Sequence, residues 1–166
     1  MVWRDREVAR AMLRNEQPFQ ALRLKRLYMA EGQLDNPAVV IAFSSDLRCH
    51  ASLEELSLCD AALDTAAAFG AFVDACIAVR LRTLELAWCH YPPSALPQLT
   101  RLIAAGALRE LNVSNRDVQI FNEAHEESTQ LFVAAVRASA LTRLLFYEVL
   151  PDNVMEAAAF INARHQ

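Results

Sequence analysis

The chain has 166 residues, of which 54% are hydrophobic and 22% are charged, with only three glycines and six prolines. This composition supports one domain with a sizeable core and excludes a disordered, collagen-like or linker-like chain. The formal net charge of -4 gives no general basic excess, so we expect no nucleic-acid partner. The one short basic cluster along the sequence, Arg23, Lys25 and Arg26, is expected to be a solvated strand edge.

The N-terminal region is expected to be helical over residues 2–13 and to act, within residues 1–23, as a cap or a partial unit. Its many charges differ from the apolar run of a signal peptide. The most apolar stretch, residues 61–79, is alanine-rich and contains Asp64 and Asp74, so we expect no membrane span. We therefore expect a cytoplasmic location, or the interior of a host cell if a bacterium secretes the protein.

From residue 24 onward, one pattern recurs: an apolar residue, two residues, an apolar residue, one residue and an apolar residue. Its five occurrences are Leu24-Leu27-Met29, Leu53-Leu56-Leu58, Leu81-Leu84-Leu86, Leu108-Leu111-Val113 and Leu141-Leu144-Phe146. Their starts are separated by 29, 28, 27 and 33 residues. Near-constant spacing of this kind indicates an internal repeat.

A segment with apolar residues at intervals of three and four follows each occurrence, which predicts a helix. Asn36 and Pro37 suit the N-cap and the first position of the first such helix. The apolar stripes are Val40, Phe43 and Leu47; Phe69, Phe72, Val73, Cys76 and Ile77; Leu96, Leu99, Leu102 and Ile103; Leu131, Phe132, Ala135 and Val136; and Val154, Ala158 and Ile161. Glu123, Glu126 and Glu127 are expected near the start of the fourth helix, where the helix dipole favours negative charge.

Each unit is thus a short strand, a turn and a helix, which cannot bury its apolar edges alone but can do so when stacked. The pattern L-x-x-L-x-L in helix-bearing units of about 28 residues resembles leucine-rich repeats of the ribonuclease-inhibitor-like subtype. The resemblance covers residues 24–161, and its best match is the stretch from Leu81 to Tyr91. It implies an α/β solenoid, a short curved horseshoe of about five repeats, with a parallel sheet on the concave face and helices on the convex face.

Two irregularities accompany this resemblance. Cys89 stands where the family places asparagine or cysteine, whose side chain ties adjacent turns together, whereas the equivalent positions of the other units hold Gly32, Ala61, Arg116 and Val149. The fourth unit is longer, with residues 117–122 as the expected bulge. The repeats and the C-terminal helix together make up residues 24–166.

The C-terminal helix, residues 153–164, is apolar on more than one side. A capping helix should have a polar outer face. We therefore expect this helix to pack on two surfaces, to meet a second copy in a homodimer, or to meet a continuing solenoid in a longer protein.

No catalytic motif is present, so we expect a protein that is not an enzyme and that uses no cofactor or metal. Glycine-rich phosphate loops, H-E-x-x-H and G-x-S-x-G do not occur. Two Cys-His neighbours, Cys49-His50 and Cys89-His90, leave a thiol-dependent hydrolase using Cys89 or Cys59 as one alternative. Adjacent residues on a strand point to opposite sides, which argues against direct pairing, and the repeat register points Cys89 inward.

The residues between the apolar positions are expected on the exposed strand face. They are Arg26, Tyr28 and Glu31; Glu55, Ser57, Cys59 and Asp60; Thr83, Glu85 and Trp88; Glu110, Asn112 and Asn115; and Arg143, Leu145 and Tyr147. Exposed aromatic residues such as Trp88 often dominate interface energy. The carboxylates of Glu55, Asp60, Glu85 and Glu110 are expected to select a basic partner.

The sequence therefore predicts a scaffold that binds a partner protein through this face. The predicted partner-binding residues are Tyr28, Glu55, Asp60, Glu85, Trp88, Glu110, Asn112, Arg143 and Tyr147. An alternative is the substrate-recognition segment of a larger effector or ubiquitin-ligase-type protein. Fold analogy supports both readings, and fold alone does not fix function.

Overall fold

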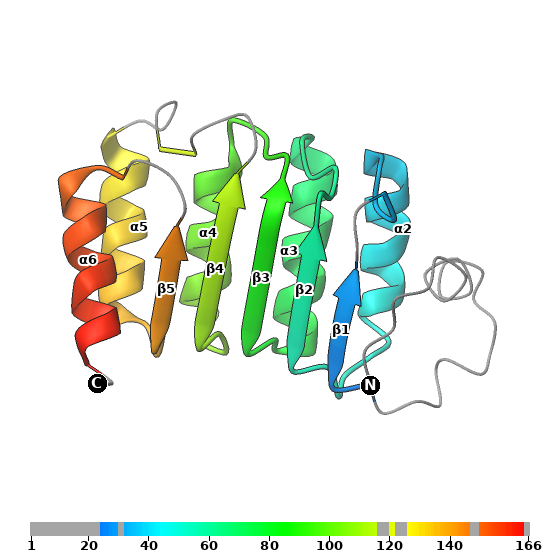
Figure 1. The fold of residues 1–166 in the computed structure, drawn as a ribbon, viewed down its shortest axis with the longest axis horizontal. Helices are drawn as coiled ribbons and strands as arrows, with labels where there is room; N and C mark the ends of the chain where they lie inside the picture. Colours follow the sequence, from blue (N-terminus) through cyan, green and yellow to red (C-terminus); the bar gives the residue numbers. More distant parts are fainter. Residues whose placement is uncertain (1–23, 30–31, 116–119, 122–125, 147–149, 165–166) are drawn as a thin grey trace.

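The molecule has two layers, one of strands and one of helices (Figure 1). It is a computed structural model that describes residues 24–29, 32–115, 120–121, 126–146 and 150–164. In chain order the elements are β1 (Arg26–Met29), α2 (Pro37–Leu47), β2 (Glu55–Cys59), α3 (Ala66–Val79), β3 (Thr83–Cys89), α4 (Ala95–Ala104), β4 (Glu110–Asn115), α5 (Glu126–Ala138), β5 (Arg143–Phe146) and α6 (Asp152–Ala163).

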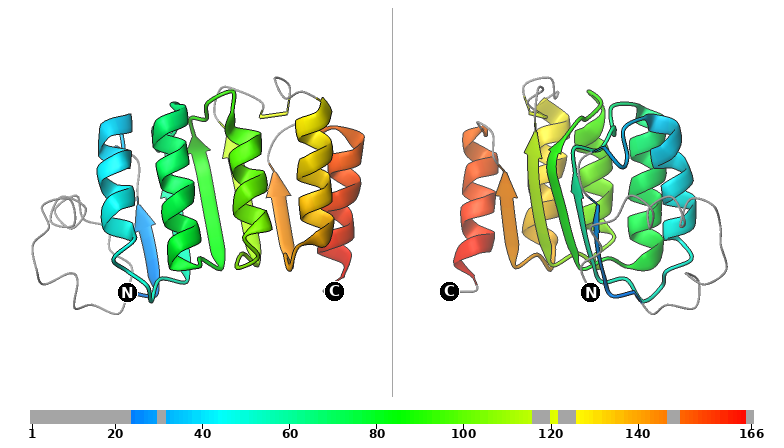
Figure 2. Two further views of the ribbon diagram at one scale, coloured as in Figure 1. Left: turned by 180° about the vertical axis from the view of Figure 1, so that it is seen from behind. Right: turned by 45° about the vertical axis from the view of Figure 1, so that its right-hand side comes forward.

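The strands form one parallel sheet in the order β1-β2-β3-β4-β5, so each strand pairs with the one that follows it in sequence. Seen from behind, helices α2 to α5 cover one face of this sheet (Figure 2). Among the described residues no helix covers the opposite face of β1 to β4, which we call the open face (Figure 1). Strand and helix alternate along the whole described chain. The structure therefore confirms the predicted α/β class, the single parallel sheet and the layer of helices on one side.

The apolar positions of the repeat align in rows across the sheet. Parallel pairing places the second apolar positions opposite one another, as Leu27, Leu56, Leu84, Leu111 and Leu144. The third positions form a parallel row of Met29, Leu58, Leu86, Val113 and Phe146. All but Phe146 are buried, and each fully buried side chain of this size contributes about 1.5–3 kcal/mol.

The apolar stripes of the helices pack against these two rows. The helices α2 and α3 begin at residues that favour an N-cap. Asn36 is the N-cap of α2, where its side chain accepts a hydrogen bond from the Val39 N–H at 3.0 Å, and Pro37 opens the helix. Thr65 caps α3 in the same way through the Ala68 N–H, at 3.2 Å. The buried stripes of α2, α3 and α4 include the predicted residues, except that Ile77 is half-buried.

Helix α5 corrects one expectation. Leu131 was predicted in its buried stripe but is 58% exposed, and Thr129 and Val133 are buried in addition to Phe132 and Val136. Residue 131 lies two positions from both 129 and 133, which is about 200° around a helix, so the two sides cannot face the core together. Glu126 and Glu127 occupy the first turn as expected, whereas Glu123 lies outside the described residues.

Helix α6 lies at the edge of the sheet beside β5 (Figure 1). The side-chain amide of Asn162 accepts a hydrogen bond from the Leu144 N–H and donates one to the Leu144 carbonyl, both at 3.0 Å. One side chain thus takes the place that a neighbouring strand would have at this edge, which protects it from edge-to-edge pairing. The outer side of α6 is apolar as predicted, with Met155 49% and Phe160 51% exposed.

Several expectations fall outside the described residues. These are the helix over residues 2–13, the position of Glu31, most of the bulge at 117–122 and the side chain of Tyr147. Ile120 and Phe121 of that bulge are described and buried, and Phe121 packs edge-on against Phe132 and Phe146. Within the described ranges, no helix has both the length and the apolar character needed to cross a bilayer.

Candidate functional site

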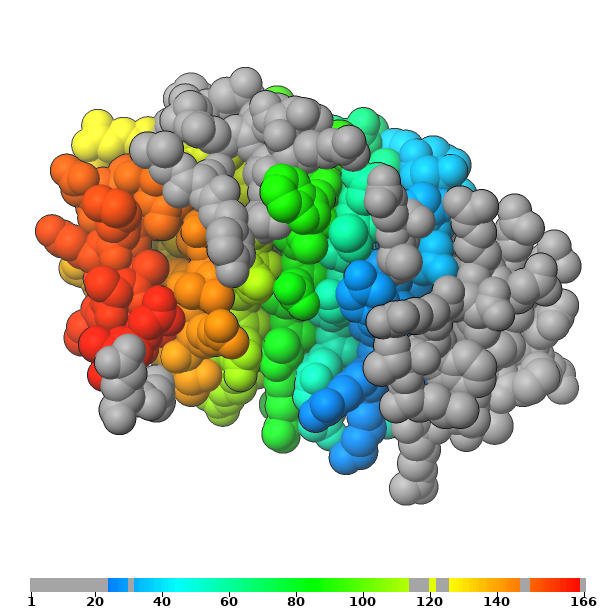
Figure 3. All heavy atoms as spheres, viewed as in Figure 1, coloured from blue at the N-terminus to red at the C-terminus, as the bar shows by residue number. Residues whose placement is uncertain are grey.

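Figure 3 shows the molecule from the side of the open face. The strand register places two rows of side chains on this face, in alternation with the buried rows. We call the first the charged row; it consists of Arg26, Glu55, Thr83, Glu110 and Arg143. We call the second the central row; it consists of Tyr28, Ser57, Glu85, Asn112 and Leu145. Six of the nine predicted partner-binding residues therefore lie in adjacent positions on one surface.

The charged row is internally paired. Arg26 Nε lies 3.0 Å from Glu55 Oε2, and an Arg143 guanidinium nitrogen lies 4.0 Å from Glu110 Oε2. Two cations thus face two carboxylates, and the row has no net charge. The predicted preference for a basic partner does not arise from Glu55 and Glu110.

Glu85 differs from them because it is held by neutral neighbours. Its Oε2 accepts a hydrogen bond from the Ser57 hydroxyl at 3.0 Å, and its Oε1 accepts one from the Asn112 amide at 3.3 Å. Among the described residues, no cation pairs with it. A carboxylate held in one position at the centre of the sheet loses little conformational freedom when a partner's donor binds it.

Trp88 is placed by an irregularity of β3. The register changes between the pairs Leu86–Val113 and Cys89–Asn115, so Ala87 and Trp88 together lie opposite one residue of β4. Such a bulge redirects a side chain, and Trp88 has the left-handed φ of 57° that non-glycine residues seldom adopt. Its side chain is 58% exposed at the carboxyl end of β3. The repeat pattern predicted the exposure of Trp88 but not the bulge.

Asp60 occupies the matching position at the end of β2. It also has a left-handed φ, 56°, and its N–H donates to the Ala87 carbonyl at 2.9 Å. Its Oδ1 lies 3.7 Å from His90 Nε2. Asp60 therefore lies near the end of the face that carries Trp88, about where predicted, and has a histidine neighbour that the sequence did not indicate.

The positions of the cysteines concern the alternative hypothesis of a thiol-dependent hydrolase. Cys89 is fully buried, and its Sγ lies 3.9 Å from the Leu58 carbonyl of the preceding unit. Burial raises the pKa of the Cys89 thiol to about 12, and burial also raises the pKa of Cys76. A thiol with so high a pKa has almost no thiolate at neutral pH, so Cys89 is poorly suited to act as a nucleophile.

The described part of the chain contains no group of three or more His, Cys, Asp or Glu residues arranged to hold a metal ion. None of the four cysteines forms a disulfide. Comparison of the sequence with protein-family models and with curated proteins gives no match to either. The geometry of the open face is therefore the basis for a functional proposal.

Proposed function

We propose that this chain is a leucine-rich-repeat scaffold of the ribonuclease-inhibitor-like subtype that binds a partner protein through the open face of its sheet. The observation that carries the proposal is Trp88, a large aromatic side chain held 58% exposed on a bulge of the central strand. Exposed, rigidly placed aromatic residues are the side chains most often found at the energetic centre of an interface.

The residues of the open face near Trp88 also suit an interface with a partner protein. Tyr28 is 41% exposed and Leu145 is half-buried in the central row, so apolar groups lie on both sides of Glu85. An interface of apolar anchors with a few oriented polar groups has this composition. Glu85 would accept hydrogen bonds from a basic or amide group of the partner.

Four cysteines without a disulfide among them fit a reducing compartment. We accordingly place the interaction in the cytoplasm, or inside a host cell for a secreted bacterial protein.

The test is affinity capture with two matched double variants. W88A/E85A removes the aromatic anchor and the oriented carboxylate, whereas L131A/E127A removes an equally exposed apolar residue and a carboxylate from α5 on the helix layer. We expect W88A/E85A to lose the captured partner by at least about tenfold, because truncating such an anchor often costs about 2 kcal/mol. L131A/E127A should capture it as well as the wild type.

Circular dichroism and thermal unfolding check that both variants remain folded. If W88A/E85A keeps the partner while L131A/E127A loses it, the partner binds the helix layer and the proposal is wrong.

A further inference from the structure

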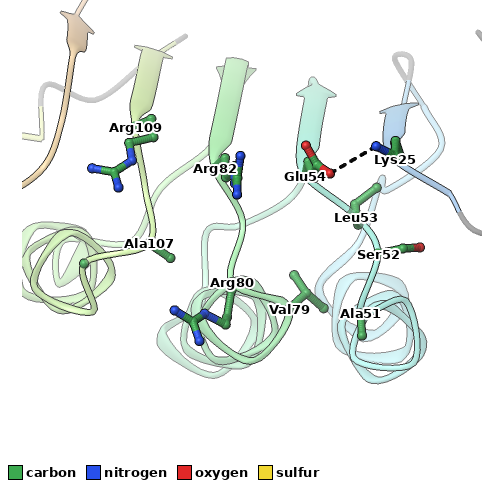
Figure 4. Close-up of a pocket in the computed structure, with 11 residues that line it drawn as sticks. Lys25, Ala51, Ser52, Leu53, Glu54, Val79, Arg80, Arg82, Ala107 and Arg109 are labelled. Atoms are coloured by element: carbon green, nitrogen blue, oxygen red, sulfur yellow. Dashed lines mark ion pairs between the residues drawn. The ribbon is translucent and has the colours of Figure 1, made fainter.

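A basic groove lies at the end of the sheet opposite to Trp88, where the helix-to-strand loops meet the amino ends of the strands (Figure 4). Its volume is about 590 Å³, which is within the range of small-ligand sites. The loops that line it precede β2, β3 and β4. Its charged side chains are Lys25, Glu54, Arg80, Arg82 and Arg109.

Four of these side chains come from one position of the repeat. Lys25, Glu54, Arg82 and Arg109 each follow the first leucine of their units, and we call them the basal row. Backbone hydrogen bonds keep them adjacent: the Glu54 N–H donates to Lys25, the Arg82 N–H to Glu54 and the Arg109 N–H to Arg82, at 2.9, 2.9 and 2.7 Å. Neighbouring strands lie about 4.8 Å apart, so Arg82 and Arg109 are side by side.

The charges of the groove are unbalanced. Lys25 Nζ pairs with Glu54 Oε1 at 3.4 Å, which leaves three arginines without a carboxylate among the described residues. Four cations and one carboxylate give a local excess of three positive charges on a chain whose formal net charge is -4. Like charges at neighbouring positions repel one another, so the two adjacent guanidinium groups of Arg82 and Arg109 do not stabilise each other.

The guanidinium groups remain available for a ligand. Arg109 donates a hydrogen bond to the Ala140 carbonyl at 2.9 Å, and within the described part of the chain neither Arg80 nor Arg82 forms an ion pair. Arg80 ends α3 with a left-handed φ of 58°, a position that usually favours glycine, and Figure 4 shows its side chain directed toward the loop at Ala107. Three arginines from two consecutive loops therefore line one groove.

The guanidinium N–H donors of the three arginines favour one kind of ligand. Each guanidinium presents five N–H donors in a planar fork, whereas a single carboxylate has only two oxygens to share among three such groups. A phosphate group has three acceptor oxygens and up to two negative charges, and arginine binds it in a bidentate manner.

We propose that this groove binds a phosphate group, carried either by a free small molecule or by a phosphorylated side chain of a protein. The groove lies at the amino ends of the strands and Trp88 lies at the carboxyl end of β3, so this site does not use the residues of the partner-binding proposal. Arg80, Arg82 and Arg109 are the binding residues, and Lys25, tied to Glu54, has a smaller part.

The test is calorimetric titration of the full chain, in phosphate-free buffer at constant ionic strength, with three probes. They are inorganic pyrophosphate, a neutral peptide with one phosphoserine, and the same peptide with glutamate in its place. We expect one-to-one binding of pyrophosphate or of the phosphopeptide, at least about tenfold tighter than the glutamate peptide, because of the extra acceptors and charge of phosphate. Tighter binding of pyrophosphate identifies a free ligand, and tighter binding of the phosphopeptide a protein-borne one.

Matched variants distinguish binding at this groove from general attraction by the positively charged side chains of the protein. R82Q/R109Q should weaken binding by at least about tenfold, because both bidentate partners are lost. R137Q/R164Q changes the net charge equally at exposed positions outside the groove and should bind as the wild type does. R82K/R109K keeps the charge but loses the forked donors, and it should fall between them.

Thermal unfolding of each variant checks that the fold is intact. Three results overturn the proposal: neither phosphate probe binds saturably, the glutamate peptide binds as tightly as the phosphopeptide, or the two glutamine variants weaken binding equally.

Discussion

The charged row of the open face and the basal row run across the same strands only one residue apart, yet their charges are arranged in opposite ways. In the charged row, Arg26 faces Glu55 and Arg143 faces Glu110. In the basal row, Lys25 pairs with Glu54, but Arg82 and Arg109 are neighbours and have no carboxylate partner among the described residues. A repeat sets where side chains lie on the sheet, but it does not set whether their charges pair with one another. One row pairs its charges within the molecule, and the next keeps charge available for a ligand.

The largest effect is expected from the core that supports both rows. Leu84 is fully buried on the central strand, directly after Thr83 of the charged row, and Leu84→Ala should lower the free energy of unfolding by about 2–5 kcal/mol, through lost transfer energy and a cavity. Urea unfolding followed by circular dichroism measures the change. Leu131→Ala is the control, since its side chain is 58% exposed, and it should shift stability by less than about 0.5 kcal/mol. Equal losses for the two variants would show that the rows do not rest on this leucine.

A smaller effect is expected at the edge of the sheet, where the charged row ends at Arg143 of β5. Asn162→Ala removes both side-chain hydrogen bonds to the Leu144 backbone and should cost about 1–3 kcal/mol, because a partly buried donor and acceptor lose their partners. Faster amide exchange at Leu144 should accompany the loss. Asn153→Ala, the same substitution at an exposed position of α6, should change little. An unchanged Leu144 exchange rate in Asn162→Ala would contradict the role assigned to this amide.

The smallest effect distinguishes the two rows most sharply. A double-mutant cycle on Arg26 and Glu55 should give a favourable coupling of about 0.2–1 kcal/mol, as exposed ion pairs do. The cycle on Arg82 and Arg109 should give a coupling of opposite sign, and both couplings should shrink in about 1 M salt. A favourable or salt-independent coupling between Arg82 and Arg109 would contradict the view that these two arginines repel each other while Arg26 and Glu55 attract.

The repeat explains which parts of the fold could be predicted. Leu56, Leu84 and Leu111 are adjacent because each unit repeats the same separation, and that information lies in the spacing of the leucines. The N-cap at Asn36 is equally local, since a short polar side chain followed by proline favours the start of a helix. The exposure of Leu131 was missed because two overlapping stripes fit the sequence of α5 and only packing selects one.

The site was predicted less completely, for reasons of the same kind. The face that carries Glu85 and Trp88 follows from alternation along a strand, but the left-handed bulge at Trp88 depends on pairing with β4, which spacing does not encode. Asn162 meets Leu144 through tertiary packing of α6. The basal row is not visible as a cluster along the sequence, because its members are separated by 27 to 29 residues. Aligning the position after the first leucine of each unit would reveal Lys25, Arg82 and Arg109.

Partner binding by the open face is the central claim, and hydroxyl-radical footprinting of the purified complex tests it most directly. Free protein should be oxidised readily at Trp88, which is 58% exposed, and at Met155 of α6, which is 49% exposed. In the complex we predict strong protection of Trp88 and an unchanged rate at Met155. Protection of Met155 with an unchanged rate at Trp88 would contradict the account and place the partner, or a second copy of the chain, on the C-terminal helix.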